Sequence, residues 1–101
     1  MSPNKNYLAG RRFEYERKKA WETTGYTVLR TAGSHGFADL VAVRSGGHVT
    51  FIQCKIVSTM AELERLIVDF RNNPPLQPSK FYHLCIELRL RGSRRVEQAF
   101  V

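Results

Sequence analysis

The stretch ADLVAVRSGGHVTFIQCKI, residues 38–56, decides the fold. Its first part, residues 38–44, and its last part, residues 49–56, are rich in β-branched and apolar residues, which favour strands. The turn Ser45-Gly46-Gly47-His48 lies between them, and its glycines supply the positive φ angles that tight hairpin turns need. The stretch therefore predicts two antiparallel strands joined as a hairpin.

The sequence on either side of the hairpin predicts helices and further strands. Thr59 and Glu62 have the spacing of a capping box, in which each side chain satisfies a backbone N–H at a helix start, and apolar residues then recur at helical intervals. The three prolines of residues 72–79 end that helix. Outside the hairpin, the expected elements in chain order are a helix over residues 4–23, a strand over 26–31, a helix over 60–71, and strands over 81–88 and 96–101.

This order, α-β-β-β-α-β-β, predicts an α/β fold with a mixed central sheet of about five strands flanked by helices. The 101 residues, 43% of them hydrophobic, suffice for one core, so we expect a single domain over residues 1–101. No apolar run approaches the ~20 residues that span a bilayer, and the start has no apolar segment of a signal peptide. We therefore expect a cytoplasmic protein, in a prokaryotic or a virus-infected cell.

The charge of the chain favours a polyanionic partner. The 16 Lys and Arg exceed the 9 Asp and Glu by seven, and the excess lies mainly near the two ends. Basic residues that neutralise phosphates release counterions from nucleic acid, which gives affinity without sequence recognition. A basic composition that serves solubility alone is the other interpretation. Cys54 and Cys85 lack the spacing of a zinc site, and we expect both to be reduced core residues.

Three residues of the hairpin could carry chemistry. Asp39 opens the first strand, and Gln53 and Lys55 lie on one face of the second, since side chains alternate along a strand. Together they offer hard oxygen ligands for Mg²⁺, to which the backbone carbonyl of Cys54 could be added, with the lysine stabilising charge on a phosphate. Without further support, Asp39 is a turn residue and Lys55 a solvated strand charge.

Two other features point to the same place. Glu14 lies beside Phe13 at the margin of the apolar stripe of the first helix, where its carboxylate could reach the sheet edge. Its alternative role is an ion pair with Lys18, four residues later. Arg30 leaves a strand into a loop of small residues that ends at Ser34, and such an arginine can hold a phosphate, although these residues also make good turns.

The motifs of the chain, taken in their order along the sequence, resemble those of the archaeal-type Holliday junction resolvases, which are nucleases of the PD-(D/E)XK superfamily. The resemblance covers nearly the whole chain and extends into the later strands. It rests on the following pieces: Gly10 and Glu14 in a G-x-x-x-E pattern, VLRTAGS at 28–34, ADLVA at 38–42, FIQCK at 51–55 and LIVDF at 66–70.

The resemblance implies a restriction-endonuclease-like core and a metal-dependent endonuclease. It implies a metal site of Asp39, Gln53, Lys55 and Glu14, with Mg²⁺ as the metal and Mn²⁺ as a substitute, and it places Arg30 and Ser34 near the scissile phosphate. It also implies homodimers that make paired symmetric nicks in four-way junctions, a substrate whose two-fold symmetry suits two sites on a two-fold axis. We expect the dimer interface on the exposed apolar part of the second helix, including Phe70.

Two features depart from the family's pattern. Gln53 stands where these resolvases usually carry Glu, which removes a negative charge from the site; glutamine also occurs there in Mrr-like restriction enzymes, and an introduced substitution is another explanation. The loop after Ser34 is longer, and His35 in it is either a base, a phosphate contact or a plain loop residue. We expect further DNA contacts from Lys5, Arg11, Arg12 and Arg30. The alternatives are a PD-(D/E)XK nuclease that cuts ordinary duplex and a silent DNA-binding module.

Overall fold

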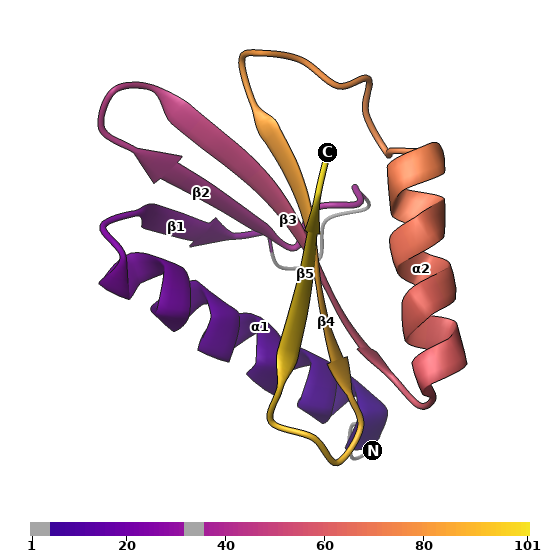
Figure 1. The fold of residues 1–101 in the computed structure, drawn as a ribbon. Coiled ribbons are helices and arrows are strands. Elements are labelled where there is room, and N and C mark those ends of the chain that lie inside the picture. Colours follow the sequence, from indigo (N-terminus) through magenta and orange to yellow (C-terminus); the bar gives the residue numbers. More distant parts are fainter. Residues whose placement is uncertain (1–4, 32–35) are drawn as a thin grey trace.

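The protein is a five-stranded mixed sheet with one helix on each face (Figure 1). The computed structural model describes residues 5–31 and 36–101. The strands lie in the order β1-β2-β3-β4-β5; β3 and β4 are parallel, and the other neighbours are antiparallel. The elements are α1 (Lys5–Thr23), β1 (Thr27–Arg30), β2 (Leu40–Arg44), β3 (His48–Val57), α2 (Met60–Asn72), β4 (His83–Leu90) and β5 (Val96–Phe100).

The predicted order of elements and the mixed sheet are confirmed, and the local signals explain them. Gly46 and Gly47 have φ angles of 96° and 87° in the hairpin turn, and residues other than glycine rarely adopt such positive φ angles. The Thr59 hydroxyl accepts from the Glu62 N–H at 3.1 Å and so caps α2. Because β3 and β4 run parallel, α2 serves as the crossover between them.

Some boundaries differ from the predicted ones. β2 begins at Leu40, so Asp39 precedes the strand instead of opening it. β4 begins at His83, and Phe81, which was expected to start it, is 75% exposed. The Phe81 N–H donates to the Ser79 hydroxyl within a local turn, so it is not available to a strand neighbour.

The sheet separates two apolar cores. On the face of α1, Trp21 packs with Val28, Leu40 and Ile52, and on the face of α2 the core includes Leu63, Phe70, Leu84, Leu88 and Ala99. Since side chains alternate along β3, Ile52 and Cys54 belong to the first face, while Gln53 and Lys55 belong to the second. The candidate site residues Gln53 and Lys55 of β3 therefore emerge on the side of α2.

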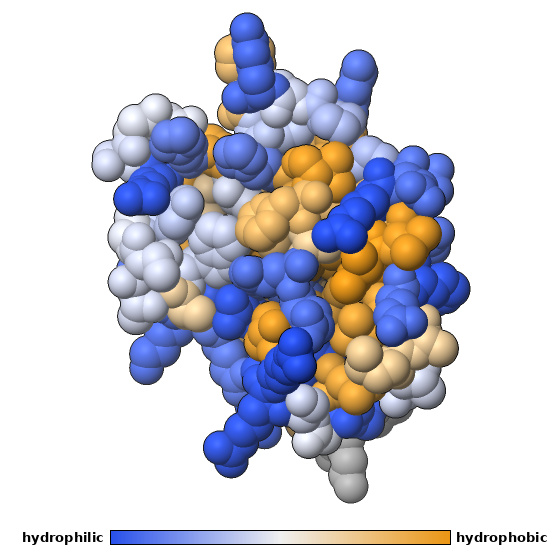
Figure 2. All heavy atoms as spheres, viewed as in Figure 1, coloured by the Kyte–Doolittle hydropathy of each residue, from blue (hydrophilic) through white to orange (hydrophobic). Residues whose placement is uncertain are grey.

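The expected exposure of Phe70 is wrong. Its ring is 5% exposed because it fills the core beneath α2, so it offers no surface for a dimer interface. The large exposed apolar residues of α2 are Met60 and Val68. Figure 2 shows apolar atoms gathered among charged side chains over this helix.

A buried carboxylate joins α1 to the sheet. Glu87 on β4 is 0% exposed. Its oxygens accept from Arg17 at 2.9 and 3.1 Å and from the Trp21 indole at 3.2 Å, and the Gln98 amide also donates to it. A buried charge is tolerated when a partner and hydrogen bonds compensate its lost hydration, as they do here. Among the described residues, no helix is long and apolar enough to cross a membrane.

Candidate active site

The candidate site lies where β2 stops and β3 continues. Pairing between these strands ends at Leu40 and Ile52, whereas β3 runs on to Val57 with β4 along its other edge. From Gln53 onward, no described strand pairs with the β2 side of β3. We call this stretch, residues 53–57, the free edge of β3.

Asp39 is fixed at the start of the free edge by three hydrogen bonds. Its N–H donates to the Ile52 carbonyl at 2.8 Å, and its carbonyl accepts from the Thr31 N–H at 3.0 Å. Its carboxylate Oδ2 accepts from the Cys54 N–H at 2.8 Å, in the place that a strand carbonyl would otherwise take. The carboxylate therefore lies at the edge of the sheet and is not turned into the core.

Glu14 approaches the same place from α1. Its Oε1 accepts from Arg30 Nε at 2.9 Å, and both side chains are largely buried. The alternative pairing of Glu14 with Lys18 does not occur, because Lys18 instead pairs with Glu22 at 2.9 Å. Arg30, the last residue of β1, thus holds the Glu14 carboxylate of α1 at the sheet edge.

Both carboxylates have raised pKa values. Burial raises the pKa of Asp39 above its ordinary value, although the hydrogen bond from Cys54 and the charges of Lys55 and Arg30 act against this. Burial also raises the pKa of Glu14, and the negative charge of Asp39 raises it further. A nearby cation would favour the charged forms of two such partly buried carboxylates.

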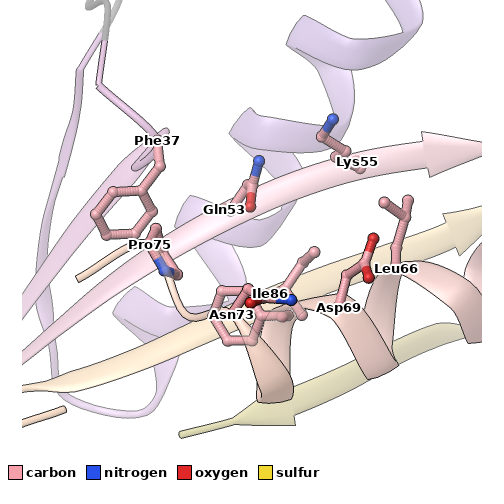
Figure 3. A pocket seen from close by; sticks show the side chains of 9 residues that line it. Phe37, Gln53, Lys55, Leu66, Asp69, Asn73, Pro75 and Ile86 are labelled. Atoms are coloured by element: carbon pink, nitrogen blue, oxygen red, sulfur yellow. The ribbon is translucent and has the colours of Figure 1, made fainter. Parts of the chain in front are cut away.

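Gln53 and Lys55 lie on the other face of β3. They line a pocket of about 380 Å³ under α2, with Phe37, Asp69 and Asn73 among its other walls (Figure 3). Lys55 is exposed, and its charge acts on the Asp39 carboxyl. Asp39 and Glu14 are not among the residues that line this pocket, and the link between the two sides of the sheet is the charge of Lys55 acting on Asp39.

Several further expected site residues have definite places. The Cys54 thiol lies on the α1 side with its pKa raised by burial, so it stays protonated and only the backbone of this residue is suited to the site. The Arg30 and Arg11 guanidiniums lie over the Tyr15 ring, 4.9 and 5.7 Å from its centre. Arg12 lines a separate pocket beside β4. Ser34, His35 and the side chain of Lys5 lie outside what the structure describes.

The sequence interpretation missed Tyr15, Asp69 and Asn73. Tyr15 follows Arg11 by four residues, a spacing that places both on one side of a helix and could have indicated their contact. Asp69 and Asn73 have the same spacing near the end of α2, but which strand they face depends on the crossover from β3 to β4. That contact between distant segments leaves no local signal.

The donors present fit a hard divalent cation. Asp39, Glu14 and Gln53 offer carboxylate and amide oxygens, the ligand types that Mg²⁺ and Mn²⁺ prefer. Within residues 5–31 and 36–101, no three side chains of His, Cys, Asp or Glu gather in a metal-binding group.

Comparison with known proteins identifies the family. The family model described as archaeal Holliday junction resolvase matches residues 5–68, which include Glu14, Arg30, Asp39 and the whole of β3. The chain belongs to this family. The resolvase has the fold of a solved relative, the Holliday junction resolvase of the archaeal hyperthermophile Archaeoglobus fulgidus, at 21% identity and a TM-score of 0.55 over 90% of this chain and 71% of that chain. No curated protein matches the sequence.

Membership of the family gives the function of this resolvase in outline. It resolves Holliday junctions, and it is therefore a nuclease whose partner is branched DNA. The family also implies a divalent metal cation, for which the oxygen donors at the free edge of β3 are suited.

Proposed function

We propose that the resolvase is a Mg²⁺-dependent, structure-selective endonuclease that cuts four-way junctions by paired symmetric nicks. The observation that carries the proposal is the position of Asp39, which three hydrogen bonds hold at the free edge of β3 between Glu14 and Lys55. The two nicks call for two active sites related by a two-fold axis, and so for a homodimer. The buried ring of Phe70 leaves the dimer surface to other residues.

Four groups would hold the metal ion. These are the carboxylates of Asp39 and Glu14, the side-chain oxygen of Gln53, and the backbone carbonyl of Cys54. The N–H and carbonyl of one strand residue face the same edge, and the Cys54 N–H faces Asp39, so its carbonyl is directed to the free edge too. When bound, Mg²⁺ supplies the Lewis-acid chemistry of phosphodiester hydrolysis.

The remaining side chains act on the phosphate and on water. The Lys55 ammonium lies within electrostatic reach of Asp39 and stabilises the charge that builds on the phosphate during attack. Arg30, already oriented by Glu14, presents a guanidinium to a phosphate oxygen. Ser34 and His35 stay predictions as phosphate contacts, since both lie outside the described residues.

Gln53 sets the charge of the site. With Glu14 and Asp39 ionised, the side-chain ligands carry two negative charges, where a glutamate at position 53 would make three. Fewer negative charges weaken the hold on a divalent cation, so we expect this resolvase to need more metal than a version with Gln53→Glu.

The deciding experiment compares a four-way junction with a linear duplex of the same sequence, each incubated with Mg²⁺ or Mn²⁺. We expect paired nicks in the junction and little cleavage of the duplex. Equal cleavage of both substrates would favour a nuclease of ordinary duplex. Binding without cleavage by the natural chain, together with cleavage by Gln53→Glu, would show that Gln53 has silenced the site.

A further inference from the structure

A second pocket, away from the free edge of β3, is lined by arginines. Its volume is about 200 Å³. Arg12 of α1, Arg89 near the end of β4, and residues 91–93 of the β4–β5 turn line it, with Ala9 and Ile56 as apolar contacts. We call it the arginine pocket. Three arginines therefore line one small cavity, and one of them, Arg89, already pairs with Glu16, which does not line it.

The turn that forms one wall is fixed to the sheet. The Arg91 N–H donates to the Val57 carbonyl at 2.8 Å, and the Ser93 N–H donates to the Leu90 carbonyl at 2.9 Å. Gly92 takes a φ of 85°, which allows the chain to reverse tightly. The Ser93 hydroxyl accepts from the Arg95 N–H at 3.1 Å, so its own hydrogen remains to be donated. The wall is therefore rigid and carries donors.

Arg89 is held in position before any ligand arrives. Its Nη2 donates to Glu16 at 2.6 Å, and its guanidinium lies 4.6 Å from the centre of the Phe13 ring. Its Nε is buried and has no hydrogen-bond partner among the described residues. A buried donor without a partner is costly, and a positioned guanidinium binds the oxygens of a phosphate well.

The position of the pocket relates it to the cleavage site. Ile56 lies two residues beyond Cys54 on the same face of β3, a separation of about 7 Å along the strand. Arg12 lies two residues before Glu14 on α1. Along both β3 and α1, the arginine pocket therefore lies close to residues of the candidate metal site.

We propose that the arginine pocket binds a second backbone phosphate of the DNA, distinct from the phosphate that is cleaved. The proposal rests on the DNA-cleaving function proposed above and adds a phosphate subsite to it. Because phosphate contacts position a protein on nucleic acid without reading sequence, this subsite sets the register of the bound strand against Asp39.

Single neutral phosphates in the DNA test this assignment. Each phosphate of a four-way junction is replaced in turn by an uncharged methylphosphonate, and binding is measured by fluorescence anisotropy without divalent metal. With the natural chain, we expect one position outside the cleavage site to lower the affinity about tenfold. In Arg12→Gln and Arg91→Gln, we expect about tenfold weaker binding of the unmodified junction and no further loss at that position.

Arg94→Gln is the matched control, because Arg94 is exposed, lies in the same segment and does not line the pocket. We expect this variant to keep its sensitivity to the methylphosphonate. We also expect the slope of log affinity against log salt to fall by about one in the pocket variants. An equal loss in Arg94→Gln, or a methylphosphonate effect that persists in both pocket variants, would overturn the subsite.

Two further measurements distinguish a DNA phosphate subsite from a site for free anions, and test the subsite separately from the nuclease activity. Inorganic phosphate is titrated against the natural chain while the arginine side-chain NMR signals are recorded. If it shifts the signals of Arg89 and Arg91 but no methylphosphonate outside the cleavage site weakens binding, the pocket takes a free anion and the DNA assignment is wrong. Cleavage is measured separately, so a chain that fails to cut junctions yet shows the paired methylphosphonate effect would refute the nuclease and keep the subsite.

Discussion

Two carboxylate sites lie along α1, and they differ in what surrounds them. Glu87 receives hydrogen bonds from Arg17, Trp21 and Gln98 and is shut off from solvent. Among the described residues, Asp39 and Glu14 have fewer donors: one backbone N–H for the first carboxylate and the Arg30 guanidinium for the second. The pKa of both is raised by burial.

In the function proposed above, a carboxylate serves stability at Glu87 and chemistry at the free edge of β3. At Glu87 the protein itself supplies every partner, so nothing further is needed to neutralise the charge. At the free edge of β3, in the function proposed above, part of that task falls to a divalent cation. The predictions below test this division.

The largest expected effect is the loss of cleavage in Asp39→Asn. The amide can still accept from the Cys54 N–H, but it removes the charge between Glu14 and Lys55. We expect the single-turnover rate of junction cleavage to fall by about 10³-fold, with a comparable loss in Lys55→Ala. Glu22→Gln, which breaks an exposed pair with Lys18, is the control and should cut normally. Undiminished nicking by Asp39→Asn would refute the site.

Glu87→Gln should lower the stability of the fold and leave cleavage unchanged. It leaves Arg17 partly buried without its counter-charge, and we expect the free energy of unfolding to fall by about 3 kcal/mol. Urea unfolding measures this loss. Below the transition, the rate of cleavage per folded molecule should stay unchanged, because Glu87 does not face the free edge. Glu97→Gln, at an exposed pair with Arg95, is the control and should change stability little.

Gln53→Glu sharpens the comparison by adding the missing charge to the functional site. We expect the Mg²⁺ concentration for half-maximal cleavage to fall by about tenfold, since more negative ligands bind the ion more tightly. Gln77→Glu adds the same charge in an exposed loop and serves as the control. A metal requirement that is the same in all three proteins would mean that the side chain at position 53 does not contact the ion.

The pH dependence of cleavage follows from the raised pKa values of Asp39 and Glu14. As the pH falls through these values, the carboxylates take up protons and lose their hold on the metal, so the rate falls. Protons and the ion compete for the same oxygens, and more Mg²⁺ should therefore move the midpoint to lower pH. Single-turnover rates at two metal concentrations measure this, and a midpoint independent of the metal would contradict it.

The parts of this structure that depend on neighbouring residues could be predicted from the sequence. The hairpin was predicted from Gly46 and Gly47, and the start of α2 from Thr59 and Glu62. The order of strands and helices followed from these signals together with the prolines after α2. Boundaries were less accurate, as at Phe81, where a turn bond to Ser79 competes with the strand.

The parts that depend on distant segments could not be predicted in this way. The sequence analysis assigned no role to Glu87, because only the packing of α1 brings Arg17 and Trp21 to it. Phe70 was expected on the surface because nothing local shows which side of α2 meets the sheet. The helical spacing of Glu14 and Lys18 indicated a pair that the more distant Arg30 prevents.

The smallest expected effect concerns stability at the functional site. A carboxyl group whose pKa is raised in the folded protein binds its proton more tightly there than in the unfolded chain. Its contribution to stability is favourable at low pH and is lost as the pH rises through the folded pKa, which leaves a cost at neutral pH.

Removing the charge of Asp39 removes that cost. At pH 7 and without divalent metal, Asp39→Asn should therefore unfold at a slightly higher temperature than the natural chain, whereas Glu87→Gln unfolds at a lower one. Adding Mg²⁺ should raise the midpoint of the natural chain more than that of Asp39→Asn, because a ligand that binds only the folded state stabilises it. If Asp39→Asn instead unfolds well below the natural chain, the carboxylate at the free edge is as fully compensated as Glu87, and the contrast between the two sites does not hold.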